Sequence, residues 1–507
     1  MNNVYEIIKK NGYRGIAVVD DNSSISYRDL FNFCEGMRER FSHLQKDDCV
    51  IIYAKKSVKY VNIMVAMLSI GVAYLSLDEH TPVEKVKHYS KLLNARYVFV
   101  DQPCEIENEI IISAIGFQKN NVEAHTHGGR EYKDSDLAYM ICTSGSSGEP
   151  KIVMIEHHSL INLVLSLNEK IYKNVLADRQ LHIAVVASFS FDASVKQIFC
   201  SLCFGHTLYI CGDKDKILGR KFLDFIKKNQ IDVTDCTPTL ISSIYADKKK
   251  AKDHCLKVII TGGEELLQRQ INEVIEMFDH EIQLVNVYGP TECCVDATYY
   301  KVPMKTDGEI NQKIPIGRPL DNVILELDNN ELIIKGTSVG RGYFGKDDQG
   351  GFFTDEKGRK AYRTGDVCYE ENGLYYLVGR VDNQEKINGF RVVPSIVDFE
   401  LSKLCDVSFS VTFCIEFMKR KILCTVINSS LERKEVLSFL KKQVPDYCIP
   451  KFLIYIEENP VFNKNGKTDI NYYKRIGRNY LDEVFAETLR GGENKKNGKN
   501  PPHYTTN

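Results

Sequence analysis

Short β-branched segments alternate with helical patterns from residue 50 to residue 287, and this alternation limits the possible folds of the chain more than any other feature. Strands are predicted over residues 50–53, 73–77, 97–100, 182–187, 207–211, 231–236, 257–261 and 282–287, and helices over residues 57–70, 82–94, 193–203, 219–229, 238–246 and 264–278. Such alternation predicts mostly parallel sheets covered by helices. Ligands of these sheets bind beyond the carboxyl ends of the strands.

The pattern changes past residue 300. Residues 331–334 and 373–378 predict a small antiparallel β region, and residues 385–480 predict a small α+β unit. We therefore expect a large α/β N-terminal domain of residues 1–381, with parallel sheets covered by helices plus the small β region. A small α+β C-terminal domain should follow over residues 382–480. Residues 481–507 are predicted to be a disordered tail, whose end is rich in Asn, Lys, Gly and Pro.

Charge and cysteine usage exclude several classes of protein. The formal net charge of the 507 residues is −2, which argues against nucleic acid as the main partner. No segment resembles a signal peptide, and apolar runs such as Ile183–Ser188 are too short to span a membrane. The 16 cysteines are scattered and fit neither metal-site spacing nor a disulfide framework, so we expect a cytoplasmic protein. The adjacent Cys293 and Cys294 are interpreted as packing residues.

A glycine- and serine-rich loop suggests a phosphate site. The segment reads Leu137-Ala-Tyr-Met-Ile-Cys-Thr-Ser-Gly-Ser-Ser-Gly-Glu-Pro-Lys151, an apolar run predicted to be a strand, then six small residues and finally a lysine. Backbone N–H groups of such a loop can converge on a polyphosphate, while hydroxyls and the lysine meet its charge. The spacing is not that of a Walker A loop. Considered alone, the loop fits phosphate binding and a flexible turn equally well.

Further unusual motifs occur in a fixed order around this loop. They are Ile25-Ser-Tyr-Arg-Asp-Leu30, Leu68-Ser-Ile-Gly-Val-Ala-Tyr-Leu-Ser-Leu-Asp78, Phe191-Asp-Ala-Ser194, Asn286-Val-Tyr-Gly-Pro-Thr-Glu292, Tyr362-Arg-Thr-Gly-Asp366, Gly379-Arg-Val-Asp-Asn-Gln-Glu-Lys-Ile-Asn-Gly389, Val444-Pro-Asp-Tyr-Cys-Ile-Pro450 and Asn465-Gly-Lys-Thr-Asp469. Together they resemble the core motifs of the adenylate-forming (ANL) superfamily, specifically amino-acid adenylation domains of nonribosomal peptide synthetases. The resemblance covers residues 20–475.

The resemblance implies an AMP-forming ligase that uses ATP and Mg²⁺. A substrate carboxylate attacks the α-phosphorus of ATP, which gives an acyl-adenylate and pyrophosphate, and a thiol then displaces AMP to form a thioester. Because the transition state is crowded with negative charge, catalysis requires alignment and cationic groups.

The resemblance also implies a role for each matching residue. Thr143, Ser144 and Gly145 would embrace the triphosphate, Lys151 would lie near the leaving pyrophosphate, Gly262, Gly263 and Tyr288 would contact adenine, Thr291 would touch the α-phosphate, Glu292 would hold Mg²⁺, and Asp366 would accept both ribose hydroxyls with Arg380 nearby. Lys467 would bridge the substrate carboxylate and the reacting phosphate. Asp382 would be the hinge at which the C-terminal domain, carrying Lys467, rotates after adenylation.

The chain departs from the family pattern at three places. Ile152 follows the lysine of the loop where the family usually has glycine, and Asn388 stands where the family usually has arginine. Pro394 and Ser395 stand where acidic residues are usual. The last two departures bear on the thioester-forming conformation rather than on the adenylation step.

The motif around Asp192 indicates which class of acid is activated. By resemblance, Asp192 would pair with the α-ammonium group of an amino acid, and the side chain would meet Ala193, Lys196, Asp235, Ile260, Gly262, Val287, Val295 and Asp296, with Lys467 closing the site. Lys196 lies four residues after Asp192 on a predicted helix, so both can face one side. A lysine there suggests a substrate carboxylate and favours glutamate. Asp235 and Asp296 could instead neutralise Lys196, which would leave a polar pocket for glutamine, or they could favour a basic side chain, so these substrates stay open.

Several activities besides that of a glutamate-loading ligase remain open from the sequence. No carrier-protein motif follows residue 475, which predicts transfer to the phosphopantetheine of a separate carrier protein. A D-alanine ligase is disfavoured because Gly262 replaces the bulky cysteine of that branch. The motifs also leave open an acyl- or aryl-CoA ligase and a non-catalytic nucleotide-binding partner.

Overall fold

The computed structural model describes most of the chain. The described residues are 3–12, 15–115, 133–143, 151–175, 179–213, 219–246, 254–278, 282–304, 313–346, 350–380, 385–387, 390–417, 420–457, 461 and 468–490. The chain divides into two compact units, one formed by residues 1–143 and 151–382 and the other by the residues from 383 onward. Among the described residues, no helix combines the length and apolar character that crossing a membrane requires.

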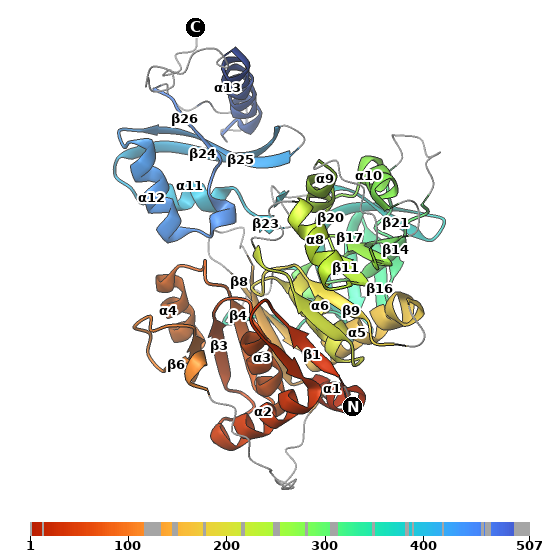
Figure 1. Cartoon of the computed structure of the whole chain (residues 1–507). Coiled ribbons are helices and arrows are strands. Elements are labelled where there is room, and N and C mark those ends of the chain that lie inside the picture. The colour runs from red at the N-terminus through yellow and green to blue at the C-terminus, as the bar shows by residue number, and fades with distance from the viewer. Residues whose placement is uncertain are drawn as a thin grey trace. The chain divides into compact units, whose positions relative to one another are not determined.

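A mixed nine-stranded sheet forms one half of the first unit (Figure 1). Its strands are, in spatial order, β15 (Arg318–Pro319), β14 (Thr298–Lys301), β13 (Gln283–Tyr288), β12 (Val258–Thr261), β11 (Val233–Asp235), β9 (His182–Val185), β10 (Thr207–Ile210), β1 (Ile16–Val19) and β2 (Ser24–Ser26). The strands from β13 to β1 are parallel to their neighbours, whereas β2, β14 and β15 are antiparallel.

A second sheet of seven strands forms the other half of this unit. Its order is β18 (Gly342–Tyr343), β8 (Lys151–Glu156), β7 (Leu137–Thr143), β4 (Ala73–Leu77), β3 (Cys49–Tyr53), β5 (Tyr97–Val100) and β6 (Glu109–Ile111). The strands from β7 to β6 are parallel, but β8 runs antiparallel to β7 and β18 antiparallel to β8. The loop that precedes Lys151 therefore joins two strands of a hairpin.

Helices cover these two sheets and also separate them. The helices of the first unit are α1 (Val4–Asn11), α2 (Tyr27–Arg40), α3 (Val58–Ile70), α4 (Val83–Leu92), α5 (His157–Lys170), α6 (Asp192–Leu202), α8 (Gly219–Lys228), α9 (Pro238–Ala246) and α10 (Gln268–Phe278), with short 3-10 turns η1 (Ile112–Ala114), η2 (Tyr172–Asn174) and η3 (Thr291–Cys293). Helix α3 contacts β1 of one sheet and β3 and β4 of the other. It is buried on nearly every side, as expected of a helix in the interior.

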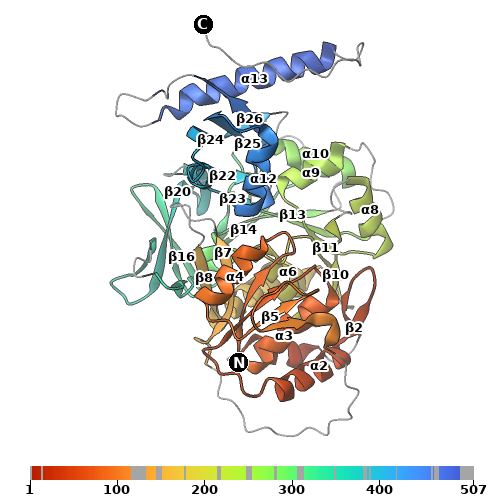
Figure 2. The ribbon, with the colours of Figure 1, turned by 90° about the vertical axis from the view of Figure 1, so that its left-hand side faces the viewer.

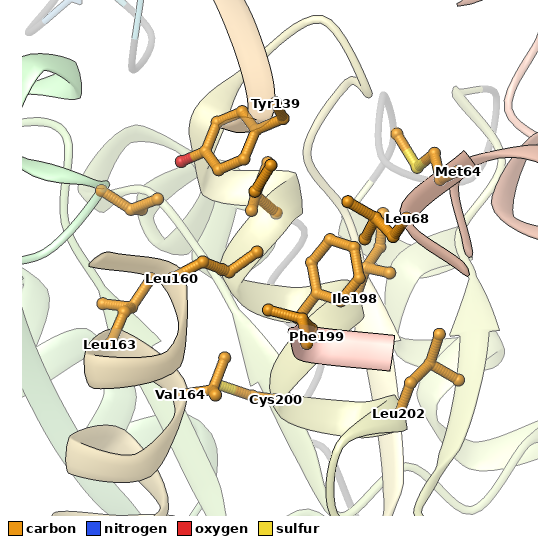
Figure 3. Packing of buried hydrophobic residues seen from close by; sticks show 14 of the residues in the cluster. Met64, Leu68, Tyr139, Leu160, Leu163, Val164, Ile198, Phe199, Cys200 and Leu202 are labelled. Carbon is orange, nitrogen blue, oxygen red and sulfur yellow. The ribbon is translucent and has the colours of Figure 1, made fainter. Parts of the chain in front are cut away.

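The core between the sheets is built from apolar side chains of three helices. Met64 and Leu68 of α3, Leu160 and Leu163 of α5 and Phe199 of α6 belong to one apolar cluster, part of which Figure 3 shows. Helix α6 also contacts β9 and β10, and α5 contacts β7 and β8. This packing fixes the first two turns of α6, which carry Asp192 and Lys196.

A small antiparallel sheet completes the first unit. Its strands are β16 (Val323–Asp328), β17 (Glu331–Gly336), β20 (Lys360–Glu371) and β19 (Phe352–Thr354), and β21 (Leu374–Arg380) pairs with β20. Asp366 of β20 lies opposite Arg380 of β21. The β region predicted past residue 300 is thus present.

The second unit is a small α+β structure. It contains β22 (Glu385–Ile387), β23 (Phe390–Val392), α11 (Ser395–Leu401), β24 (Val407–Phe417), β25 (Arg420–Ser429), α12 (Arg433–Gln443), the turn η4 (Asp446–Cys448), β26 (Phe452–Tyr455) and α13 (Ile470–Arg490). Figure 2 shows α13 along one face of the β24–β25–β26 sheet, and α11 and α12 contribute to the apolar cluster on the other. Successive side chains of β25 point to opposite faces of the sheet. Leu423 and Ile427 belong to the apolar cluster with α11 and α12, whereas Cys424 and Val426 belong to the cluster with α13.

The fold class predicted from the sequence is confirmed, with two corrections in detail. The strands and helices that were predicted between residues 50 and 287 lie within two residues of their predicted ends, except that α10 begins at Gln268 rather than at residue 264; β6, β8 and α5 of the same range were not predicted. Gly263 has φ +79° and the N–H of Leu267 donates to Oε1 of Gln270, so the helix starts late. Helix α13 continues to Arg490, so residues 481–490 are helical and do not belong to the predicted tail.

Candidate functional site

Several of the described candidate residues lie at the carboxyl ends of strands. Asp235 ends β11, Tyr288 ends β13, and Thr143 ends β7, while Gly262 directly follows β12. This is the edge at which parallel sheets bind ligands. Ser144, Gly145, Asp382 and Lys467 lie outside the described residues, so their predicted roles stay predictions.

Lys196 is the centre of a buried charged cluster. Its Nζ lies 2.8 Å from Oδ2 of Asp235 and 3.0 Å from Oδ2 of Asp296, and the side chain is only 3% exposed. One lysine and two aspartates carry a formal charge of −1. The cluster therefore brings together three residues that were predicted separately to face the substrate side chain.

Burial and charge act on this cluster in opposite directions. Burial alone would lower the pKa of Lys196, but attraction by Asp235 and Asp296 outweighs it and raises that pKa, so the ammonium keeps its charge. Burial raises the pKa of Asp235, although Lys196 opposes the shift. The neighbouring Tyr172 phenol and Cys200 thiol have pKa values raised well above their usual range, mainly by burial, so both stay neutral.

Sequence analysis missed Tyr172 and Cys200 as neighbours of this cluster. Cys200 follows Lys196 by four residues on α6, as Lys196 follows Asp192, so helical spacing contained the signal. Tyr172 belongs to the short turn η2, whose position no local pattern indicated.

Asp192 begins α6 at the same edge. Burial raises the pKa of its carboxyl group, which a hydrogen bond with Thr291 partly opposes. Thr291 is the residue predicted to touch the α-phosphate. The two predicted sites, for the amino acid and for the nucleotide, therefore meet at Asp192 and Thr291.

The turn before Asp296 has an unusual backbone. Cys294 has φ +57° and Val295 has φ +73°, a left-handed conformation that is costly for non-glycine residues and most of all for a β-branched one. The N–H of Asp296 donates to the carbonyl of Cys294 at 3.0 Å, and that of Ala297 donates to Tyr288 at 2.8 Å. Strain of this kind concentrates at functional sites. Here it directs Asp296 toward Lys196.

Gly262 allows a close approach of two strand ends. A Cβ at this position would lie 2.7 Å from the carbonyl oxygen and 2.9 Å from Cγ2 of Val287, so no larger residue fits without a shift of the backbone. Ile260 of β12 pairs with Asp235 on one side and with Val285 on the other. The predicted positions from both strands are therefore brought to one edge.

Asp366 is held by two side chains predicted to surround the nucleoside. The phenol of Tyr288 donates to its Oδ2, and Nη1 of Arg380 donates to Oδ1 at 2.6 Å. The N–H of Asp366 donates to the hydroxyl of Thr364 at 3.0 Å. Burial raises the pKa of Tyr288, so its phenol stays a donor. The three predicted residues form one hydrogen-bonded group.

Glu292 and Lys151 share a contact that sequence analysis did not predict. The phenol of Tyr343 donates to Oε1 of Glu292 at 2.7 Å, and Nζ of Lys151 lies 4.5 Å from the centroid of the Tyr343 ring. Burial raises the pKa of Tyr343, which keeps the proton on the phenol. A tyrosine on the two-residue strand β18 has no local sequence signal, since its neighbours come from β8 and η3.

The donor set around Glu292 fits Mg²⁺ bound together with phosphate oxygens. Glu292 is 1% exposed and offers a hard carboxylate oxygen. Within the described part of the chain, three or more potential metal ligands gather only at Glu79, His80 and Asp213, a group that does not include Glu292. Mg²⁺ usually takes one or two carboxylates plus substrate phosphates, which a single glutamate satisfies.

The structure explains the departure at Ile152 and the cysteine pair. Ile152 is buried in β8 within the apolar cluster that contains Leu75 and Met140, so it serves packing. Burial raises the pKa of Cys294 to about 12 and also raises that of Cys293, consistent with packing rather than reactivity. All 16 cysteines are free thiols. Asn388 and the side chains of Arg391 and Ser395 lie outside the described part of the chain.

Two comparisons of the sequence place the chain among known proteins. Residues 6–344 match the family described as AMP-binding enzyme. Bacitracin synthase 1 of Bacillus licheniformis is 34% identical over 484 residues, which cover 89% of this chain and 9% of that protein. Surfactin synthase subunit 1 of Bacillus subtilis (strain 168) is 30% identical over 497 residues, 89% of this chain and 13% of that protein. The chain thus spans a small part of the length of these relatives.

Solved structures share the fold at lower sequence identity. PA1221, an NRPS protein containing adenylation and PCP domains, superposes with a TM-score of 0.79 at 21% identity over 93% of this chain and 84% of that chain. The adenylation domain AlmE of Vibrio cholerae gives a TM-score of 0.78 at 19% identity over 94% and 97% of the two chains. The family match covers more than half of the chain, and the solved structures share its fold, so the chain belongs to the AMP-binding enzyme family.

Proposed function

We propose that the chain activates glutamate with ATP to form glutamyl-AMP and transfers the glutamyl group to the phosphopantetheine thiol of a carrier protein. The observation that carries the proposal is the buried Lys196 between Asp235 and Asp296. Asp192 on the same helix supplies a carboxylate for the α-ammonium group, which fatty or aryl acids lack.

The proposed reaction has two steps, formation of the aminoacyl-adenylate from ATP and transfer of the aminoacyl group to a thiol. A carboxylate oxygen of the amino acid attacks the α-phosphorus, the bond to the β-phosphate bridging oxygen breaks, and pyrophosphate leaves. The thiolate of the carrier then attacks the activated carbonyl, and AMP leaves with the electron pair of the carbonyl–oxygen bond. Thr291 and Lys151 would orient the phosphates, and Mg²⁺ held by Glu292 would neutralise phosphate charge.

Charge decides how glutamate would bind beside Lys196. The cluster of one lysine and two aspartates carries −1, so a second anion enters favourably only with a proton. Asp235 can hold that proton because burial raises its pKa. A protonated Asp235 would donate a hydrogen bond to the γ-carboxylate, while Lys196 supplies the positive charge. Glutamine and a basic amino acid are the competing substrates, since neither requires a proton.

The relatives support the amino-acid and carrier parts of the proposal. The solved structure of AlmE contains glycyl-adenosine-5'-phosphate, an aminoacyl-adenylate, and PA1221 combines adenylation and PCP domains. The proposal extends both properties to this chain. It also includes rotation of the unit that carries Lys467 about Asp382, with Lys467 acting in adenylation.

Amino-acid-dependent ATP–pyrophosphate exchange tests the proposal. Glutamate should give the highest exchange rate in a panel that includes glutamine, lysine, D-alanine and an aryl acid. Asp192→Ala should abolish exchange with amino acids, and Lys467→Ala should lower it strongly. Exchange with glutamine or lysine but not with glutamate would disprove the substrate, whereas aryl-acid exchange that survives Asp192→Ala would indicate a CoA ligase.

A carrier-loading assay tests the second step. Glutamate-dependent labelling of a phosphopantetheinylated carrier protein, followed by mass spectrometry, should show a thioester that hydroxylamine releases. ATP binding without exchange for any acid would instead support a non-catalytic nucleotide-binding partner.

A further inference from the structure

Tyr343 contacts the two groups that meet the nucleotide's charge in the proposed function. Its hydroxyl donates to Oε1 of Glu292 at 2.7 Å. The ammonium of Lys151 lies over the face of its ring, with Nζ 4.5 Å from the centroid. The side chain is 3% exposed. One buried phenol therefore joins a carboxylate from η3 to a lysine from β8.

The position of Tyr343 is fixed by its strand. Tyr343 lies opposite Val153 in the antiparallel pair of β18 and β8, and the N–H of Phe344 donates to the carbonyl of Ile152 at 2.9 Å. The ring of Phe352 packs edge-on against the Tyr343 ring at 5.1 Å between centroids. The phenol is therefore held by the same strand that begins with Lys151.

The backbone around both contacts is closely fitted. The N–H of Gly340 donates to the carbonyl of Glu292 at 2.9 Å, so η3 is joined to the segment that leads into β18 by main chain as well as by the phenol. A Cβ at Gly350, which has φ +62°, would lie 3.3 Å from the Tyr343 ring and 3.5 Å from Nζ of Lys151. A larger residue there would crowd the ammonium on the ring.

A phenol can orient both groups without neutralising either one. A direct ion pair between Glu292 and Lys151 would cancel the charges that Mg²⁺ and phosphate require. The hydroxyl instead donates to one carboxylate oxygen, which leaves the negative charge for a cation. The ring attracts the ammonium through its quadrupole, which leaves the positive charge for phosphate.

We propose that Tyr343 is a positioning residue that aligns the carboxylate of Glu292 for Mg²⁺ and the ammonium of Lys151 for the phosphates of one nucleotide. The inference rests on the proposed function for the roles of Glu292 and Lys151. Tyr343 itself touches neither the metal nor the reacting atoms.

Nucleotide binding with and without metal tests this inference. Calorimetry measures the dissociation constant of a non-hydrolysable ATP analogue in Mg²⁺ and in EDTA, and the paramagnetic resonance of Mn²⁺ reports metal binding directly. Tyr343→Phe removes the hydroxyl and keeps the ring, whereas Tyr343→Leu removes both. Tyr362→Phe is the matched control, because its hydroxyl lies 3.3 Å from that of Tyr343 and both contacts of Tyr343 stay in place.

The two variants should separate the two contacts. Tyr343→Phe should weaken binding of the Mg²⁺ complex and of Mn²⁺ about tenfold, as expected for a hydrogen bond to a charged group, and leave metal-free binding unchanged. Tyr343→Leu should also weaken metal-free binding about threefold through loss of the cation–π contact. Tyr362→Phe should change both constants less than about twofold.

The outcomes distinguish this inference from the proposed function. If the wild-type protein binds the analogue equally with and without Mg²⁺, the magnesium role of Glu292 fails and the inference fails with it. If the wild type responds to Mg²⁺ and Tyr343→Phe responds equally, only the inference is overturned. Thermal unfolding of each variant checks that the variant is folded at the temperature of the binding measurements.

Discussion

The two buried charge clusters of the first unit hold their carboxylates in different ways. Beside the predicted amino-acid side chain, Asp235 and Asp296 are paired with an ammonium group. On the nucleotide side, Glu292 is held by a phenol and Asp366 by a phenol and a guanidinium. An ion pair with Lys196 or Arg380 offsets the charge of a carboxylate, whereas the phenol of Tyr343 orients Glu292 and leaves its charge in place. Substitutions should therefore act on selectivity in the first cluster and on nucleotide or metal affinity in the second.

The largest effect is expected when the cation of the first cluster is removed. Lys196→Met leaves two buried carboxylates without their partner, which should cost about 3–5 kcal/mol of unfolding free energy at neutral pH. Exchange with glutamate should fall more than about 100-fold. Urea denaturation and the exchange panel measure the two effects. A variant that keeps both its stability and its glutamate preference would show that Lys196 does not recognise the substrate.

Removing a charge from the second cluster should act on nucleotide binding. Asp366→Asn weakens the contacts with Arg380 and Tyr288 and with the predicted ribose, so the dissociation constant for ATP should rise about 100-fold. The amino-acid preference should not change, because Asp366 belongs to the other cluster. Calorimetry with ATP and the exchange panel provide the two readouts. A shift in amino-acid preference would contradict the separation of the clusters.

The pH dependence of glutamate activation sharpens the contrast. Because burial raises the pKa of Asp235, its protonated form persists to higher pH than in an exposed aspartate. In the proposed function glutamate binds together with that proton, so its KM should rise with pH above this pKa, by up to about tenfold per pH unit. The KM for glutamine should show no such slope. Parallel slopes for both substrates, or a slope that survives in Asp235→Asn, would refute proton-coupled recognition.

The smallest effect is expected from the phenol of Tyr288. Tyr288→Phe removes its hydrogen bond to Asp366 but keeps the ring that is predicted to stack on adenine. The dissociation constant for ATP should therefore rise only about threefold to tenfold, less than in Asp366→Asn. Fluorescence titration with a labelled ATP analogue measures the change. A loss as large as that of Asp366→Asn would assign the main role of Tyr288 to its hydroxyl rather than its ring.

Sequence patterns predicted what depends on local periodicity and on motif order. Most strands and helices between residues 50 and 287, and the position of Asp192 and Lys196 on one helix, follow from spacing along the chain. Contacts between segments that lie far apart in the sequence could not be predicted in this way. Tyr343 reaches Glu292 only because β18 pairs with β8, and Tyr172 reaches the Lys196 cluster only through tertiary packing.

The pairing of Lys196 with both aspartates could also not be predicted from the sequence. Asp235 and Asp296 were recognised as candidates to neutralise Lys196, but the two distances of 2.8 Å and 3.0 Å were needed to show that both contact it. The late start of α10 depends on the left-handed Gly263 and on the Gln270 side chain, which propensity does not reveal.

The left-handed turn at Cys294 and Val295 has a consequence for engineering this enzyme. The two residues that carry the backbone strain are not the residue that contacts Lys196, since Asp296 follows them with its own N–H bonded to the carbonyl of Cys294. Retargeting to another amino acid can therefore exchange the side chain at 296 while the turn stays intact. Libraries that randomise 294 and 295 together with 296 would lose the turn in most of their members.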